Sequence, residues 1–77
     1  MEEKIKNIMA TVFKCDVSEI NEDTSPDTLE QWDSLRHMNL VVALEEEFQI
    51  SLTEDEMVEM LNYKLVYTII KSKISND

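Results

Sequence analysis

The sequence contains no glycine, and its 77 residues include only one proline, Pro26, and one cysteine, Cys15. Tight turns between β-strands depend on glycine, so a β-sandwich or barrel is disfavoured and helices are expected. A lone cysteine excludes a disulfide within the chain and is typical of a reduced thiol in a cytoplasmic protein. A chain of this length can bury only a small core, so we expect a single domain spanning residues 1–77.

Basic residues are scarce in the middle of the sequence. The chain has 7 basic residues against 17 acidic ones, a formal net charge of -10, and Arg36 is the one basic residue between Cys15 and Tyr63. Such a surface repels nucleic acids and anionic membranes, and it attracts basic protein partners. The alternative interpretation is that the charge serves solubility alone.

Long apolar runs are missing as well. No stretch approaches the roughly 18 apolar residues of a membrane span, and no basic segment followed by an apolar run opens the chain. We therefore expect no membrane insertion, no signal peptide and a cytoplasmic location. The acidic segment 16–33 lacks the spacing and the turn glycine of a calcium loop, so no dedicated metal site is expected.

Apolar residues recur with a helical period in four segments, 2–14, 34–48, 54–61 and 63–73. Thr53 and Glu56 form a capping-box pattern at the start of the third segment, which turns Met57, Met60 and Leu61 inward. Residues 75–77 should fray. The long connection 15–33 should be functional or contain a helical turn. Four apolar residues are spaced to anchor it to the core: Val17, Ile20, Leu29 and Trp32.

The segment 34–48 predicts a helix with two apolar faces. At 100° per residue, the core face groups Leu40, Val41, Leu44 and Phe48, with His37 near its N-terminal end. The opposite face places small apolar side chains among polar and acidic ones, at Leu35, Asn39, Val42, Glu45 and Glu46. Single exposed aliphatic residues are common, but this pattern is also typical of a surface that docks a basic partner.

Ser34 begins this helix, and either Asp33 or Ser34 can cap it. A helix N-terminus favours an anion, so an exposed serine there suits a phosphate ester. A serine nucleophile would need a base, an orienting acid and an oxyanion hole, and the chain has no G-x-S-x-G elbow. We therefore expect no catalytic activity, with His37 a partly buried structural residue and Cys15 inert.

The stretch Trp32-Asp33-Ser34-Leu35, followed by Leu-Val-Val-Ala-Leu-Glu-Glu-Glu-Phe at 40–48, resembles the acyl carrier protein family. The resemblance implies an all-α, acidic four-helix bundle with three longer helices, a short third helix and a long first loop. It implies that a separate transferase attaches 4′-phosphopantetheine from coenzyme A to Ser34, and that acyl groups are then held as thioesters. Asp33 would help position the transferase chemistry or its metal ion.

The resemblance also implies how the chain meets its partners. Five positions match those with which the family docks enzymes: Leu35, Asn39, Val42, Glu45 and Glu46. The partners would be the phosphopantetheinyl transferase, acyl-activating enzymes or acyltransferases, and ketosynthase-like enzymes with basic patches, and the carrier itself would be a monomer. From the placement of the methionines, we expect the acyl chain to lie among the apolar side chains of the second to fourth helices, lined by Met38, Met57 and Met60.

Three departures separate the chain from carriers of fatty-acid synthesis, which usually have a glycine before the serine motif and an acidic residue after it. Here Glu30-Gln31-Trp32 precedes the motif, Arg36 follows it, and Asn39 replaces a usual glutamate. The resemblance thus implies a specialised lipid, polyketide or lipopeptide pathway. A D-alanyl-type carrier is one alternative, and an acidic helical interaction module without a prosthetic group is another.

Overall fold

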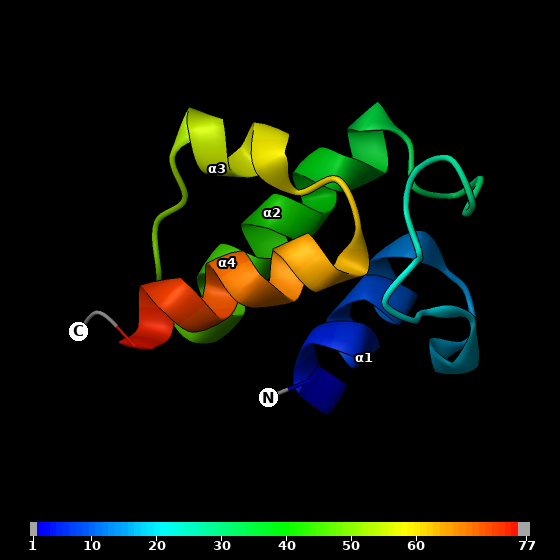
Figure 1. Cartoon of the computed structure of the whole chain (residues 1–77), viewed down its shortest axis with the longest axis horizontal. Coiled ribbons are helices and arrows are strands. Elements are labelled where there is room, and N and C mark those ends of the chain that lie inside the picture. Colours follow the sequence, from blue (N-terminus) through cyan, green and yellow to red (C-terminus); the bar gives the residue numbers. More distant parts are fainter. Residues whose placement is uncertain (1, 76–77) are drawn as a thin grey trace.

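A computed structural model describes residues 2–75, and the regular elements in that range are all helical (Figure 1). They are α1 (Glu2–Phe13), the 3-10 turn η1 (Val17–Glu19), α2 (Ser34–Phe48), α3 (Glu54–Glu59) and α4 (Tyr63–Ser75). The predicted all-α fold with a short third helix and a long first connection is confirmed. No helix of the described range is long and apolar enough to cross a membrane.

The helix ends differ from the predicted ones by a few residues. α1 ends one residue earlier than expected, α3 ends at Glu59 rather than Leu61, and α4 continues to Ser75. Ser75 is therefore helical, whereas Asn76 and Asp77, also predicted to fray, lie outside the described residues. The predicted capping box is confirmed, because Thr53 N–H donates to Glu56 Oε1 at 2.8 Å and Glu56 N–H donates to Thr53 Oγ1 at 3.1 Å.

Two helices end on a residue with a left-handed backbone. Lys14 follows α1 with φ 56°, and Gln49 follows α2 with φ 54° and ψ 53°. This conformation usually falls to glycine at helix C-termini. Because the chain has no glycine, larger residues adopt it and accept the steric cost.

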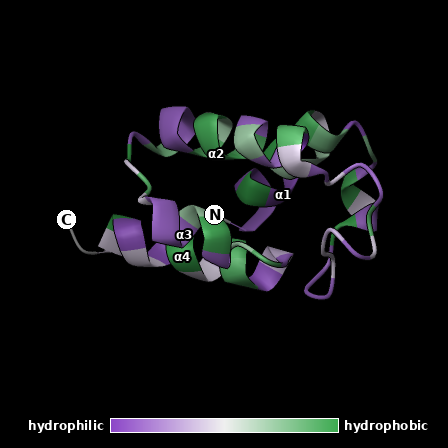
Figure 2. Cartoon of the chain, turned by 90° about the horizontal axis from the view of Figure 1, so that it is seen from above, coloured by the Kyte–Doolittle hydropathy of each residue, from purple (hydrophilic) through white to green (hydrophobic). Residues whose placement is uncertain are grey.

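The inner face of α2 packs against the rest of the bundle and its outer face does not. Leu40, Val41 and Leu44 are buried, as predicted, and Phe48 is half-buried. Figure 2 shows hydrophilic and hydrophobic residues along the same helix, with α3 and α4 on the other side of the molecule. α1 packs against α2, and α4 completes the bundle.

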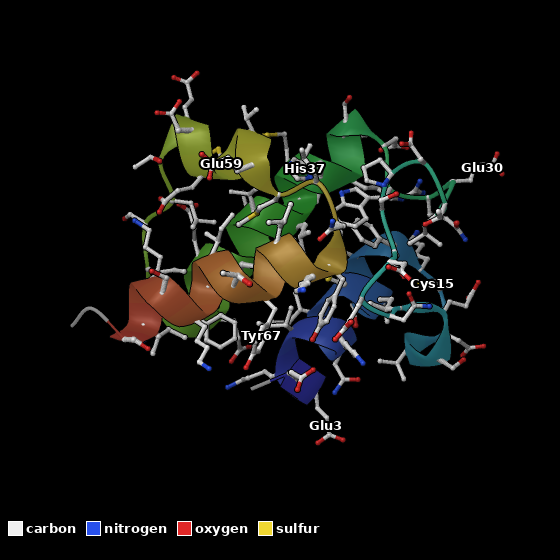
Figure 3. The ribbon with its side chains drawn as sticks, viewed as in Figure 1. Glu3, Cys15, Glu30, His37, Glu59 and Tyr67 are labelled. Carbon is white, nitrogen blue, oxygen red and sulfur yellow. The ribbon has the colours of Figure 1, made fainter. Side chains whose placement is uncertain are left out.

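The connection between α1 and α2 wraps one end of the molecule, and Figure 3 labels Cys15 near its start and Glu30 near its far end. Ile20, Leu29 and Trp32 anchor it as predicted, but the prediction for Val17 is wrong, since 44% of its surface is exposed. Val17 opens the 3-10 turn, which follows the end of α1 closely and leaves this side chain on the outside. Deeper in the loop, the carbonyl of the buried Thr24 accepts the Tyr63 N–H at 2.8 Å, which ties the connection to α4.

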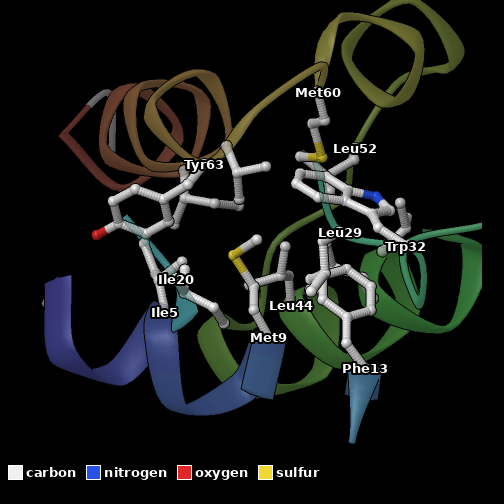
Figure 4. Packing of buried hydrophobic residues seen from close by; sticks show 14 residues of the cluster. Ile5, Met9, Phe13, Ile20, Leu29, Trp32, Leu44, Leu52, Met60 and Tyr63 are labelled. Carbon is white, nitrogen blue, oxygen red and sulfur yellow. The ribbon is translucent and has the colours of Figure 1, made fainter. Parts of the chain in front are cut away.

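The core is centred on aromatic and methionine side chains. Trp32 stacks on Phe13 with ring centroids 5.1 Å apart, and Figure 4 shows Met60 and Leu52 close to the indole. No residue of α3 is fully buried, but the half-buried Met57 packs against the core, and Met60, just beyond the helix end, is buried in it. The prediction for Leu61 is wrong, because α3 ends two residues before it and 60% of this side chain is exposed.

Candidate functional site

Ser34 is the first residue of α2, and Asp33 is the residue that caps the helix. The Arg36 N–H donates to Asp33 Oδ1 at 2.8 Å, and Arg36 Nη1 lies 3.4 Å from Asp33 Oδ2. The choice that the sequence left open between Asp33 and Ser34 is thus settled in favour of Asp33. Ser34 is exposed, and the cap does not use its hydroxyl.

A groove of about 680 Å³ begins at Ser34 and runs between α2 and α3. Its polar residues, at Asp33, Ser34, His37 and Glu54, are outnumbered by apolar ones. Met38, Met57 and Met60, the three methionines predicted to line an acyl site, all lie in its wall. The remaining apolar lining comes from Pro26, Trp32, Val58 and Leu61. The exposed Leu61, expected in the core, therefore faces this groove instead.

His37 is half-buried, as expected, and it bridges three parts of the chain. Trp32 Nε1 donates to His37 Nδ1 at 2.9 Å, and His37 Nε2 lies 2.9 Å from the carbonyl oxygen of Met57. The imidazole also stacks on the indole, with centroids 6.1 Å apart. The sequence analysis missed this bridge. The signal that could have found it was Trp32 itself, since a buried indole N–H needs an acceptor.

The outer face of α2 presents the residues predicted to dock partners. Leu35 is 73% exposed, Val42 is 50% exposed, and Asn39 and Glu46 are also exposed. Glu45 differs from them, because it is half-buried and its Oε2 accepts the Leu52 N–H at 2.8 Å. The side chains of these four exposed residues are therefore accessible to a partner, whereas Glu45 also ties α2 to the segment that leads into α3.

The arrangement of the other titratable groups bears on metal binding and on the reactivity of Cys15. Within residues 2–75, no group of three or more His, Cys, Asp or Glu side chains is placed to hold a metal ion. Burial raises the pKa of the half-buried Cys15 thiol, and the carboxylates of Glu19 and Asp16 raise it further. This thiol is therefore a weak nucleophile near neutral pH.

Comparison with known proteins places the chain beside one family and, among others, two similar proteins. The family described as the phosphopantetheine attachment site matches residues 3–64. Polyketide-8 synthase acyl carrier protein 2 of Streptomyces avermitilis is 29% identical over 76 residues, which covers 96% of this chain and 85% of that protein. The solution structure of a holo acyl carrier protein from Geobacter metallireducens has a TM-score of 0.87 and 28% identity, covering 97% of this chain and 86% of that one.

Proposed function

The chain belongs to the acyl carrier protein family, whose prosthetic group is a covalent 4′-phosphopantetheine, and we propose that Ser34 is the residue that carries it. The observation that supports the proposal best is that Asp33 and Ser34 play different parts at the start of α2. Asp33 caps the helix, which leaves the exposed Ser34 hydroxyl available, and the apolar groove opens at the same residue. A serine at this position fits a phosphodiester, because the first turn of a helix favours an anion.

When bound, the arm supplies a thiol that holds the acyl group as a thioester, and the chain itself orients and shields this group. Asp33 fixes the first turn of α2 and, we propose, helps to position the transferase or its metal ion. Arg36 adds a positive charge beside the attachment site. The groove between α2 and α3 offers the acyl chain an apolar lining, in which Met38, Met57 and Met60 can adapt to different shapes.

The partners in this proposal are biosynthetic enzymes that dock on the outer face of α2. Leu35 and Val42 supply apolar contacts, Asn39 and Glu46 supply polar ones, and Glu45 contributes from the flank. The acidic surface would draw basic patches of a transferase, of an acyl-activating enzyme or acyltransferase, and of a ketosynthase-like enzyme. The family is one of carriers, and the chain would leave catalysis to these enzymes.

The proposed setting is a specialised lipid, polyketide or lipopeptide pathway in the cytoplasm, in which residues 1–77 act as one monomeric domain. Arg36 and Asn39 support a specialised pathway, since they change the charge of the surface that partners read. The matched Streptomyces protein, described as an acyl carrier protein of a polyketide synthase, supports it as well.

Transfer of phosphopantetheine tests the proposal. The chain is incubated with coenzyme A, Mg²⁺ and a broad-specificity phosphopantetheinyl transferase, and its intact mass is measured. We expect the wild type to gain one phosphopantetheine, Ser34→Ala to gain none, and Ser51→Ala, which changes another exposed serine, to behave as the wild type. No gain in the wild type with several transferases would favour the interaction module without a prosthetic group.

A second variant tests the docking face. Leu35→Ala should lower kcat/KM of the transferase by about tenfold, because the few residues that carry most of the binding energy of an interface each cost more than about 1 kcal/mol when truncated. The melting temperature should stay unchanged, since Leu35 is largely exposed. Equal kcat/KM for Leu35→Ala and the wild type would remove this residue from the proposed docking face.

A further inference from the structure

We propose that His37 is a positioning residue, which holds α3 at a fixed distance from α2 and thereby sets the length of acyl chain that the groove accepts. The inference rests on the proposed function, because it concerns the groove that begins at Ser34. It starts from the bridge that links the indole of Trp32, the imidazole of His37 and the carbonyl of Met57.

The partners of the imidazole fix its tautomer. An indole N–H can only donate, so Nδ1 of His37 must be the unprotonated nitrogen that accepts it. The proton of the neutral ring then lies on Nε2, which faces the Met57 carbonyl at 2.9 Å and donates to it. Both ring nitrogens are therefore used, and each joins α2 to a different part of the chain.

α3 depends on such bonds more than the longer helices do. None of its residues 54–59 is fully buried, and within the helix Met57 alone packs against the core, where it is half-buried. The helix bond at its C-terminal end is long, since the Met60 N–H lies 3.4 Å from the Met57 carbonyl. The shorter bond from His37 Nε2 thus satisfies a carbonyl that the helix end leaves poorly paired. At its other end, α3 is fixed by the Lys73–Glu56 ion pair of 2.9 Å.

All three residues of the bridge line the groove. His37 belongs to α2, Met57 belongs to α3, and Trp32, in the loop just before α2, is buried against Phe13. Since Trp32 is held by the core, it fixes the ring plane of His37, and His37 in turn fixes the C-terminal end of α3. Loss of the Nε2 bond would let this end of α3 move outward while Glu56 stays tied, and the groove would become deeper.

The first test uses the chain without its arm. In the wild type, ¹⁵N NMR of the imidazole should show the Nε2–H tautomer. In His37→Leu, the amides of Met57 to Leu61 should exchange about tenfold faster, the equivalent of one lost hydrogen bond, while those of α1 keep their rates. His37→Gln carries a donor at about the distance of Nε2 from the backbone, so it should restore much of the protection. An Nδ1–H tautomer, or equal exchange in His37→Leu and the wild type, would overturn the proposal.

The second test loads Ser34 with saturated acyl groups of increasing length and follows the methyl signals of Met38, Met57 and Met60. In the wild type, the shifts should grow with chain length and then reach a plateau where the groove is full. In His37→Leu, the plateau should move to longer chains, and in His37→Gln it should return toward the wild-type length. An unchanged plateau in His37→Leu would overturn the proposal that His37 sets the length of acyl chain that the groove accepts.

The two tests separate this proposal from the proposed function. If Ser34 cannot be loaded, the proposed function falls, and the acyl role of the groove falls with it. The tautomer and exchange measurements on the chain without its arm would still decide whether His37 holds α3. If Ser34 loads normally and the plateau is the same in all variants, only the role of His37 is refuted.

Discussion

Glu45 and Glu46 are neighbours on α2 that the structure places in different roles. Glu45 is half-buried and accepts the backbone N–H of the buried Leu52 at 2.8 Å. Glu46 is exposed, and its side chain takes part in none of the ion pairs and side-chain hydrogen bonds found within residues 2–75. Glu45→Ala should therefore lower the free energy of unfolding, whereas Glu46→Ala should not.

The expected size follows from the bond that is lost. A hydrogen bond to a charged group contributes about 1.5–3 kcal/mol, and partial exposure of Glu45 places the cost near the lower end, at about 1.5 kcal/mol. Both variants remove one negative charge and replace glutamate by alanine in the same helix, so changes in helix propensity and net charge nearly cancel between them. The difference between the two variants thus isolates the bond to Leu52.

Urea unfolding, followed by circular dichroism, measures this difference. We expect Glu45→Ala to unfold about 1.5 kcal/mol more easily than Glu46→Ala, which corresponds to a melting temperature roughly 6–12 °C lower in a domain of this size. Glu46→Ala should instead lose kcat/KM with the transferase at unchanged stability. Equal stabilities of the two variants would refute the structural role of Glu45. Both glutamates would then serve partner docking alone.

Four other predictions concern stability. The Tyr63 hydroxyl is buried without a hydrogen-bond partner within the described chain, so Tyr63→Phe should leave the free energy of unfolding unchanged or raise it by about 1 kcal/mol. Burial raises the pKa of Tyr63 from its ordinary 10 to about 12. The free energy of unfolding of the wild type, measured with urea, should therefore fall between pH 10 and about pH 12, and that of Tyr63→Phe should fall less. Gln49→Gly should add about 0.5–1 kcal/mol in the same assay, because glycine adopts the left-handed backbone without steric cost; a destabilised variant would contradict this. Added salt should raise the melting temperature by screening repulsion within a chain of net charge -10, and a flat dependence on ionic strength would count against it.

Most of the fold could be predicted from residue spacing, because apolar residues recur every three to four positions on the buried face of an amphipathic helix. The burial of Leu40, Val41 and Leu44 and the exposure of Leu35 and Val42 follow from one projection of α2. The C-terminal end of the short α3 could not be placed in this way. A helix of six residues shows too few turns for its period to decide where Leu61 points.

The candidate site was predicted unevenly, for a physical reason. The motif serine and the cap beside it are local features, so adjacent residues reveal them. The His37 bridge joins positions 32, 37 and 57, and the bond of Glu45 joins α2 to Leu52. Such contacts depend on how helices pack, which the spacing of apolar residues does not determine.

Locating the modification within the chain shows whether Ser34 is the residue that carries the prosthetic group. The wild type is treated with coenzyme A and the transferase, digested, and its peptides are fragmented in a mass spectrometer. We expect the added phosphopantetheine on the peptide that contains Trp32-Asp33-Ser34-Leu35, and we expect it to be lost from Ser34 on fragmentation. A phosphopantetheine located on Ser18, Ser25 or Ser51, or on none of the serines, would contradict it.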